Sequence, residues 1–208
     1  MPSKPRPRRH VLVIRHGQTE WSLSDQHTSR TDIDLTVQGE EDARSLRGIV
    51  ERTGLDQPYV IASPRRRAQR TAALAGLRVD ETSELFTEWD YGAYEGLTRK
   101  QIQADDEPGW AIWTHGARGG ESVAQMTARV DRAVRHVEDL PDARDVVIVS
   151  HGHFSRAFIC RFLGWPIVQG ANIDLRPAGT ALLVETDSDR RLCELHGPAG
   201  QRASSTSI

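Results

Sequence analysis

Two short apolar segments, far apart in the chain, each run almost directly into a histidine followed by glycine. Residues 11–14 (VLVI) come just before His16, and residues 146–149 (VVIV) come just before His151. Short aliphatic runs bounded by polar loops are typical of strands buried on both faces, as in a parallel sheet. Ligands of open α/β sheets bind beyond the carboxyl ends of the strands. We therefore expect both histidines at one edge of a sheet.

Apolar, strand-like runs alternate with helical patterns along the chain. Thr36 is expected to cap the first helix and Gly54 to end it, while Ser63 is expected to cap the second helix, with Pro64 at its first position. The alternation predicts an α/β fold, a three-layer α/β/α sandwich around a mostly parallel central sheet. We predict strands at 11–14, 59–62, 146–149 and 181–184, an edge strand at 192–195, and helices at 38–51, from 63, at 121–140 and at 154–163.

Residues 84–120 interrupt this alternation with aromatic residues among many glycines and charges. We predict a small irregular or helical insertion here, whose aromatic residues either line a pocket or form a small secondary core. The length of 208 residues suits one domain, which we place at residues 10–197. Residues 1–9 are predicted to form a flexible basic arm and residues 198–208 a disordered tail.

Composition excludes several classes of function. A formal net charge of -2 argues against a nucleic-acid partner. Two cysteines exclude a disulfide scaffold and a cysteine-rich zinc site, and are typical of a reducing compartment. The apolar run at 11–14 is too short for a signal peptide or a transmembrane helix. We expect a cytoplasmic protein without a membrane partner.

The same sheet edge is predicted to gather positive charge. Arg15 precedes His16, and an arginine cluster at 65–67 follows the second strand. A guanidinium matches phosphate oxygens in pairs, and helix N-termini add N–H donors. An unprotonated imidazole can attack phosphorus, and nearby guanidinium groups favour that form by lowering the histidine pKa. The pattern indicates a phosphate site, whose leaving oxygen needs a proton from a carboxylic acid.

Each of these residues also has a simpler interpretation. A histidine at a strand end can serve only as a hydrogen-bonded structural residue, and the arginines can form one solvated helix face. His151 and His153 can be interpreted as metal ligands, although no further ligands are evident in the sequence. The coincidence of histidines and arginines at one edge favours the phosphate site.

Five segments stand in the same order as the motifs of a known family. The segments are residues 15–21 (RHGQTEW), 63–72 (SPRRRAQRTA), 88–96 (EWDYGAYEG), 119–122 (GGES) and 150–153 (SHGH). Together they resemble the histidine phosphatase superfamily, which includes the cofactor-dependent phosphoglycerate mutases. The resemblance is strongest to the mutase-like acid phosphatases of actinobacteria.

The resemblance implies a role for each matching residue. His16 would be the nucleophile and would form a phosphohistidine. Arg15, Arg67 and His151 would hold the phosphoryl oxygens; Arg67 is implicated because it precedes alanine in the second motif. Glu88 would be the general acid and then the base that activates water. The family uses no metal, and no cofactor is implied.

Further positions are candidates for substrate contact on the same resemblance. The backbone N–H of Gly152 would add a donor, and Gln18 or Thr19 would shape the floor of the site. Where the mutases usually carry asparagine, this chain has Ser22, and residues 26–32 resemble a phosphatase-like branch. The candidates in this region are Ser22, His27, Thr28 and Arg30.

Hydrolysis and phosphoryl transfer between metabolites remain alternatives. The segment between Gly96 and Glu121 is short for the lid that a mutase needs to exclude water. We expect a metal-independent acid phosphatase that acts on a small phosphorylated metabolite such as a sugar phosphate, with phosphoglycerate mutase as the alternative. The presence of all five implied catalytic residues argues against a non-catalytic phospholigand-binding module. The resemblance also allows a homodimer.

Overall fold

The computed structural model describes residues 9–105, 107–141, 144–186 and 188–197. The predicted tail at 198–208 and residues 1–8 of the predicted arm lie outside the described residues. Arg9 was assigned to that arm, but it begins a strand and is only 4% exposed. Its guanidinium donates to the carbonyl oxygen of Val137 at 2.6 Å, so helix and strand contacts hold it in the domain.

The centre of the molecule is a six-stranded sheet in the order β3-β2-β4-β1-β5-β6. The first four of these strands are parallel, and β5 and β6 are antiparallel additions at one edge. The mostly parallel sheet expected from the sequence is confirmed, with a short strand β3 that the sequence analysis missed. The strands are β1 Arg9–Arg15, β2 Tyr59–Ala62, β3 Glu81–Thr82, β4 Val146–Ser150, β5 Thr180–Glu185 and β6 Arg190–His196.

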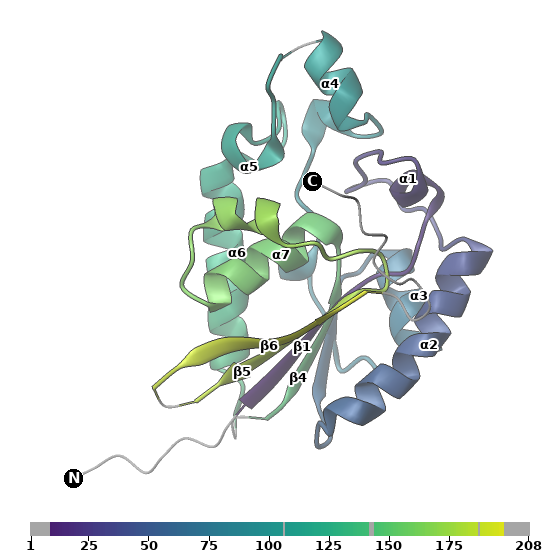
Figure 1. Cartoon of the computed structure of the whole chain (residues 1–208), viewed down its shortest axis with the longest axis vertical. Helices are drawn as coiled ribbons and strands as arrows, with labels where there is room; N and C mark the ends of the chain where they lie inside the picture. The colour runs from purple at the N-terminus through teal and green to yellow at the C-terminus, as the bar shows by residue number, and fades with distance from the viewer. Residues whose placement is uncertain (1–8, 106, 142–143, 187, 198–208) are drawn as a thin grey trace, which may run out of the picture.

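Helices cover both faces of the sheet. Figure 1 shows α2 (Val37–Thr53) and α3 (Arg66–Leu74) on one side and α6 (Val123–Glu138) and α7 (Gly152–Phe162) on the other. The short helix α1 (Glu20–Leu23) follows β1. Because helices lie on both faces of the sheet, the predicted three-layer sandwich is confirmed. None of the helices in the described ranges is both long and apolar enough to cross a membrane.

Side chains along β1 alternate between the two faces of the sheet, which explains why helices must pack on both faces. Leu12 and Ile14 belong to the apolar cluster under α2 and α3, whereas Val11 and Val13 belong to the larger cluster under α6 and α7. Successive side chains of a strand point to opposite faces, so an aliphatic run must be buried on both. Each large aliphatic side chain buried in this way contributes roughly 1.5–3 kcal/mol.

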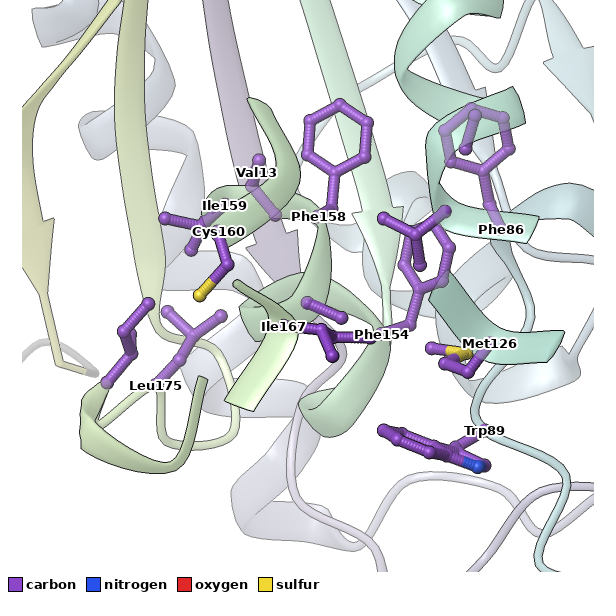
Figure 2. Packing of buried hydrophobic residues seen from close by; sticks show 14 of the residues in the cluster. Val13, Phe86, Trp89, Met126, Phe154, Phe158, Ile159, Cys160, Ile167 and Leu175 are labelled. Atoms are coloured by element: carbon purple, nitrogen blue, oxygen red, sulfur yellow. The ribbon is translucent and has the colours of Figure 1, made fainter. Parts of the chain in front are cut away.

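Aromatic rings fill the larger cluster (Figure 2). Phe154 and Phe158 lie one turn apart on α7 and contact Phe86, with ring centroids 5.6 and 6.5 Å from it. Trp89 packs near Met126 of α6 and is fully buried. These contacts fix the first turn of α7 and the segment around residue 88 against each other, which matters for the site.

The predicted ends of the first long helix are confirmed. The Thr36 side chain accepts a hydrogen bond from the backbone N–H of Gly39, and Gly54 ends α2 with a φ of 65°, a conformation that glycine adopts readily. The predicted cap of the second helix is wrong. Helix α3 begins at Arg66, two residues later than Pro64, and has no side-chain cap. Ser63 has a different hydrogen-bond partner, described below.

The insertion at 84–120 is irregular, as predicted, and carries four short helical elements. Its aromatic residues do not form a separate secondary core but belong to the large cluster under α6 and α7, and one of them also lines a pocket. Trp89 and Trp110 are buried in the core, while Tyr91 is buried but also lines a cavity. The elements are the 3-10 turns η1 (Glu84–Phe86) and η2 (Gly92–Tyr94) and the helices α4 (Arg99–Asp105) and α5 (Ile112–His115); a third turn, η4 (Ile167–Asn172), lies after α7.

Candidate active site

The carboxyl ends of β1 and β4 bring the two histidines together. Arg15 and Ser150 are paired in the sheet, and the backbone N–H of His16 donates to the carbonyl oxygen of Ser150 at 2.8 Å. The imidazole rings of His16 and His151 have centroids 5.2 Å apart and planes at 68°. The juxtaposition expected from the two strand ends is present.

His16 is held with one ring nitrogen available. Its Nδ1 lies 2.7 Å from the carbonyl oxygen of Gly17, which accepts only from a protonated nitrogen. The pKa of His16 is lowered well below its usual value, first by burial and then by the guanidinium groups of Arg67 and Arg15. A neutral ring with its proton on Nδ1 has a lone pair on Nε2. His16 therefore has the protonation state of a nucleophile.

Arg15 is built into the wall of the site. Its guanidinium donates to the carbonyl oxygen of Leu175 at 2.9 Å and packs against Gly152, where an added Cβ would lie 3.1 Å from Cζ. A side chain at position 152 would push this guanidinium away. Burial, followed by the charge of Arg156, lowers the pKa of Arg15 to about 10, so the group stays charged at neutral pH.

Arg67 has no exposed surface and does not line the cavity. Its NH1 donates to the carbonyl oxygen of Thr31 at 3.0 Å, and its NH2 donates to that of Thr28 at 3.1 Å. Arg67 thus holds the loop after α1 in place. Within the part of the chain that the structure describes, three buried nitrogens around His16 have no hydrogen-bond partner: Nε of Arg15, Nε of Arg67 and Nδ1 of His151.

Glu88 lies at the N-terminus of α7, where it is only 7% exposed. One carboxylate oxygen accepts from the backbone N–H groups of Phe154 and Trp89, at 2.8 and 2.9 Å, and the other accepts from His153 at 3.0 Å. Helix N-termini attract carboxylates in this way. The contacts fix the carboxyl group at the wall of the same cavity that contains His16.

A cavity of about 190 Å³ is lined by three of the five predicted catalytic residues, Arg15, His16 and Glu88, whereas the fully buried Arg67 and His151 do not line it. Its deep end is formed by nearly buried residues such as His16 and Glu88, and its mouth includes the exposed Asp25. Of the predicted substrate contacts, five line it and two do not. The lining residues are Arg15, His16, Thr19, Ser22, Asp25, Gln26, His27, Thr28, Glu88, Tyr91, Gly152, His153 and Arg156.

Gln18 and Arg30 are the two predicted contacts that lie outside this cavity. The side-chain oxygen of Gln18 accepts from the hydroxyl of Thr36 at 2.9 Å, which ties it to the start of α2. Arg30 forms an ion pair with Asp90 at 2.5 Å and lines a neighbouring hollow. Both predictions placed these side chains toward the substrate, and in each case an internal partner holds them elsewhere.

Arg156 is the main cavity residue that the sequence analysis missed. Its Nε donates to the carbonyl oxygen of Gly152 at 3.2 Å, and its guanidinium lies 5.0 Å from the centroid of the Trp113 ring. Burial is the largest cause of its lowered pKa. Its spacing of three and four residues from His153 and Gly152 would have placed it on the same helix face.

An imidazole and phenol wall forms the other side of the cavity. The hydroxyl of Tyr91 lies 2.6 Å from Nδ1 of His153, and the His27 ring stacks on His153 with centroids 5.9 Å apart. Burial lowers the pKa of His153 well below its usual value and raises that of Tyr91 well above its usual value. The wall is therefore polar but uncharged at neutral pH.

The histidines at 151 and 153 do not share a ligand site. Nε2 of His151 lies 2.7 Å from the hydroxyl of Ser63, whereas Nδ1 of His153 contacts Tyr91. Among the residues that the structure describes, no group of three or more His, Cys, Asp or Glu side chains is arranged to hold a metal ion.

Comparison with known families shows which superfamily the chain belongs to. The model of the histidine phosphatase superfamily (branch 1) matches residues 11–197. The chain belongs to this superfamily. The match spans both strand-end histidines, Arg67 and Glu88, so the resemblance found in the motifs is confirmed and the chain is a phosphatase.

Named relatives of this superfamily are phosphatases of several kinds. An acid phosphatase of Mycobacterium tuberculosis is 46% identical over 172 residues, which cover 83% of this chain and 84% of the relative. The sedoheptulose 1,7-bisphosphatase of Saccharomyces cerevisiae is 35% identical over 182 residues, covering 74% and 67%.

Solved structures agree with the fold. A Mycobacterium tuberculosis protein solved at 2.2 Å resolution superposes with a TM-score of 0.86 at 44% identity, covering 90% of this chain and 96% of that one. A mycobacterial glucosyl-3-phosphoglycerate phosphatase, solved with VO3, superposes with a TM-score of 0.76 at 28% identity, covering 89% and 97%.

Proposed function

We propose that this protein is a metal-independent phosphomonoesterase that works through a phosphohistidine at His16. One observation carries the proposal: the lone pair on Nε2 of His16 shares a cavity with Arg15 and with the carboxyl group of Glu88. A phosphoryl group placed there would meet a nucleophile, a positive charge and an acid. The side chains present therefore supply the groups that ester hydrolysis requires.

In the first step, Nε2 of His16 attacks phosphorus and the bond from phosphorus to the ester oxygen breaks. The carboxyl group of Glu88 gives its proton to the leaving oxygen. The oxygens of the transferring group gain negative charge, which Arg15 stabilises from the cavity wall and the buried charge of Arg67 stabilises from outside the cavity lining. The unpartnered Nδ1 of His151 is available to donate to these oxygens.

In the second step, the carboxylate of Glu88 takes a proton from water. The resulting hydroxide attacks phosphorus, the bond from phosphorus to Nε2 breaks, and inorganic phosphate leaves. Glu88 ends the cycle protonated and His16 ends it neutral, as both began. The same residue serves both steps because its carboxyl group is fixed by three backbone N–H groups.

The mouth of the cavity fits a hydroxylated leaving group. Asp25 and Ser22 line the cavity with oxygen atoms, and Arg156 adds a second positive charge whose field reaches Arg15. A sugar phosphate that carries a second anionic group meets both demands. The named relatives support this class, because they include a sugar bisphosphatase and a phosphatase of a glycosylated phosphoglycerate.

The proposal is tested by phosphate release and by trapping the intermediate. The purified protein should release inorganic phosphate from p-nitrophenyl phosphate and from sugar phosphates, with its highest rate at acidic pH. Rapid quenching with a radiolabelled ester should leave acid-labile label on His16. Interconversion of phosphoglycerates without phosphate release would instead identify a mutase, and label on another residue would refute the mechanism.

We also propose a cytoplasmic location, which is supported by the two free thiols. Cys160 is buried and Cys193 is exposed, and an exposed thiol is typical of a reducing compartment. A homodimer stays a prediction, for which the elution volume on size-exclusion chromatography is the direct measurement.

A further inference from the structure

Ser63 occupies a different position from the helix cap that the sequence predicts. It follows directly after β2 at the sheet edge and has no exposed surface. Its Oγ lies 2.7 Å from Nε2 of His151, which is also fully buried. The contact joins the end of β2 to the end of β4, two parallel neighbours in the sheet.

The direction of this hydrogen bond follows from the second partner of Ser63. The hydroxyl oxygen accepts from the backbone N–H of Arg65 at 3.3 Å. Among the described residues, the other hydrogen bond of this hydroxyl is the one to His151, and only by donating there does the hydroxyl proton find a partner. A ring nitrogen that accepts a hydrogen bond carries a lone pair, and a neutral imidazole then has its proton on Nδ1.

The ring of His151 is neutral, so the position of its single proton matters. Burial is the largest cause of its pKa lying well below the usual value, and the charges of Arg67, Arg65 and Arg129 and the ring of His16 lower it further. Nδ1 is buried, and no residue in the described ranges is its partner. An N–H there can donate to a phosphoryl oxygen, whereas a lone pair there would repel it.

The two site histidines therefore carry opposite tautomers. In His16 the carbonyl oxygen of Gly17 holds the proton on Nδ1 and leaves Nε2 as a lone pair. In His151 the hydroxyl of Ser63 occupies the lone pair on Nε2 and leaves the proton on Nδ1. One ring is prepared to attack phosphorus and the other to donate to its oxygens, although both are neutral.

We propose that Ser63 is a positioning residue that holds His151 in the tautomer with its proton on Nδ1, so that His151 donates a hydrogen bond to the transferring phosphoryl group. This inference rests on the proposed phosphatase mechanism. Ser63 touches neither the substrate nor the reacting atoms, and its hydroxyl forms and breaks no covalent bond. Its effect reaches the reaction through the imidazole of His151.

The tautomer is measured directly by nitrogen-15 NMR on protein labelled at histidine. The His151 signals are identified by their loss in His151→Gln. The wild-type protein without substrate should show a protonated Nδ1 and an unprotonated Nε2, and Ser63→Ala should show a mixture of both tautomers. A wild-type ring protonated on Nε2 would overturn the proposal, and this result does not require any variant of Ser63 to fold.

Kinetics then tests whether the tautomer matters for the reaction. Ser63→Ala should lower kcat about 10- to 100-fold and leave KM within about threefold, as expected when one transition-state donor is weakened. Ser63→Thr keeps the hydroxyl and should recover most of the loss. Ser155→Ala is the matched control, because Ser155 is a buried serine of α7 with no hydrogen-bond partner among the described residues.

The outcomes separate this inference from the proposed function. Wild-type kcat in Ser63→Ala, or an equal loss in Ser155→Ala, would overturn the positioning role. Failure of the wild-type protein to release phosphate would refute the proposed function, while the NMR experiment would still report the tautomer of His151.

Discussion

Two pairs of neighbouring imidazoles lie around one cavity, and they differ in what surrounds them. His16 and His151 meet nearly edge to face at 5.2 Å, at the ends of β1 and β4. His27 and His153 stack at 5.9 Å with their planes only 12° apart, beside the insertion. Burial is the largest cause of a lowered pKa in all four, so burial alone does not distinguish them.

The neighbours decide what each pair can do. Arg67 lowers the pKa of both His16 and His151, and Arg156 and Arg15 lower that of His153, so nearby positive charge alone does not separate the pairs. The first pair includes the lone pair on Nε2 of His16. The second pair packs against aromatic rings, with Trp110 5.4 Å from His27 and Trp113 5.3 Å from His153. We infer that the first pair performs the chemistry and that the second contacts the leaving group.

Alanine substitutions at one member of each pair test this division most strongly. His16→Ala should lower kcat/KM for p-nitrophenyl phosphate by about 10⁴-fold or more, because it removes the nucleophile. His153→Ala, a control of the same kind in the same cavity, should cost less than about 100-fold. Comparable losses in steady-state assays would show that the two pairs do not differ in function.

Glu88 lines the same cavity as His16, His27 and His153, and its role depends on the leaving group. Glu88→Gln should lower kcat/KM for a sugar phosphate by about 10²- to 10³-fold, since an alkoxide must be protonated as it leaves. The loss should be smaller for p-nitrophenyl phosphate, whose phenolate leaves without a proton. Circular dichroism should confirm folding. The same loss for both esters would contradict a role as general acid.

Arg156 adds a positive charge beside His153, so its substitution tests whether the second pair contacts the substrate. Arg156→Gln should lower kcat/KM about 10-fold or more for a sugar bisphosphate, in line with one charged hydrogen bond, and less than about threefold for the monophosphate. Arg161→Gln is the control, because Arg161 lies on the same helix but pairs with Asp131 at 2.6 Å. Equal effects on both substrates would place Arg156 at the transferring phosphoryl group instead.

Protonation of the buried imidazoles should also affect stability. Because the pKa values of His16, His151 and His153 are lowered in the folded protein, the unfolded chain binds more protons below about pH 6.5. The free energy of unfolding should fall by up to about 1.4 kcal/mol per pH unit for each such histidine as pH decreases below that value.

Thermal unfolding between about pH 7.5 and 5 measures this effect. The melting temperature should fall by several degrees toward acidic pH, and by less in His153→Phe, which removes one of the histidines with a lowered pKa. An unchanged melting temperature across this range would show that the rings are not kept neutral. A rate optimum at acidic pH then requires that the protein stays folded at that pH despite its lower free energy of unfolding.

Much of the fold could be predicted because its signals are local. The aliphatic run at 59–62 matches β2 residue for residue, and Thr36 and Gly54 mark the ends of α2 as predicted. The helix α1 and the strand β3 were missed because elements of four and two residues are too short to show a period. Ser63 was taken for a cap because serine before a helix usually is one.

By itself, the sequence determined which residue types stand at the strand ends, and hence the nature of the site. The apolar runs that stop just before Arg15-His16 and Ser150-His151 are visible without coordinates, because polar residues follow each run in the sequence. Only the tertiary structure decided which partner each side chain takes: Ser63 for His151, Asp90 for Arg30 and Thr36 for Gln18. These partners come from different elements, and the packing of three layers brings them within reach, which no local pattern encodes.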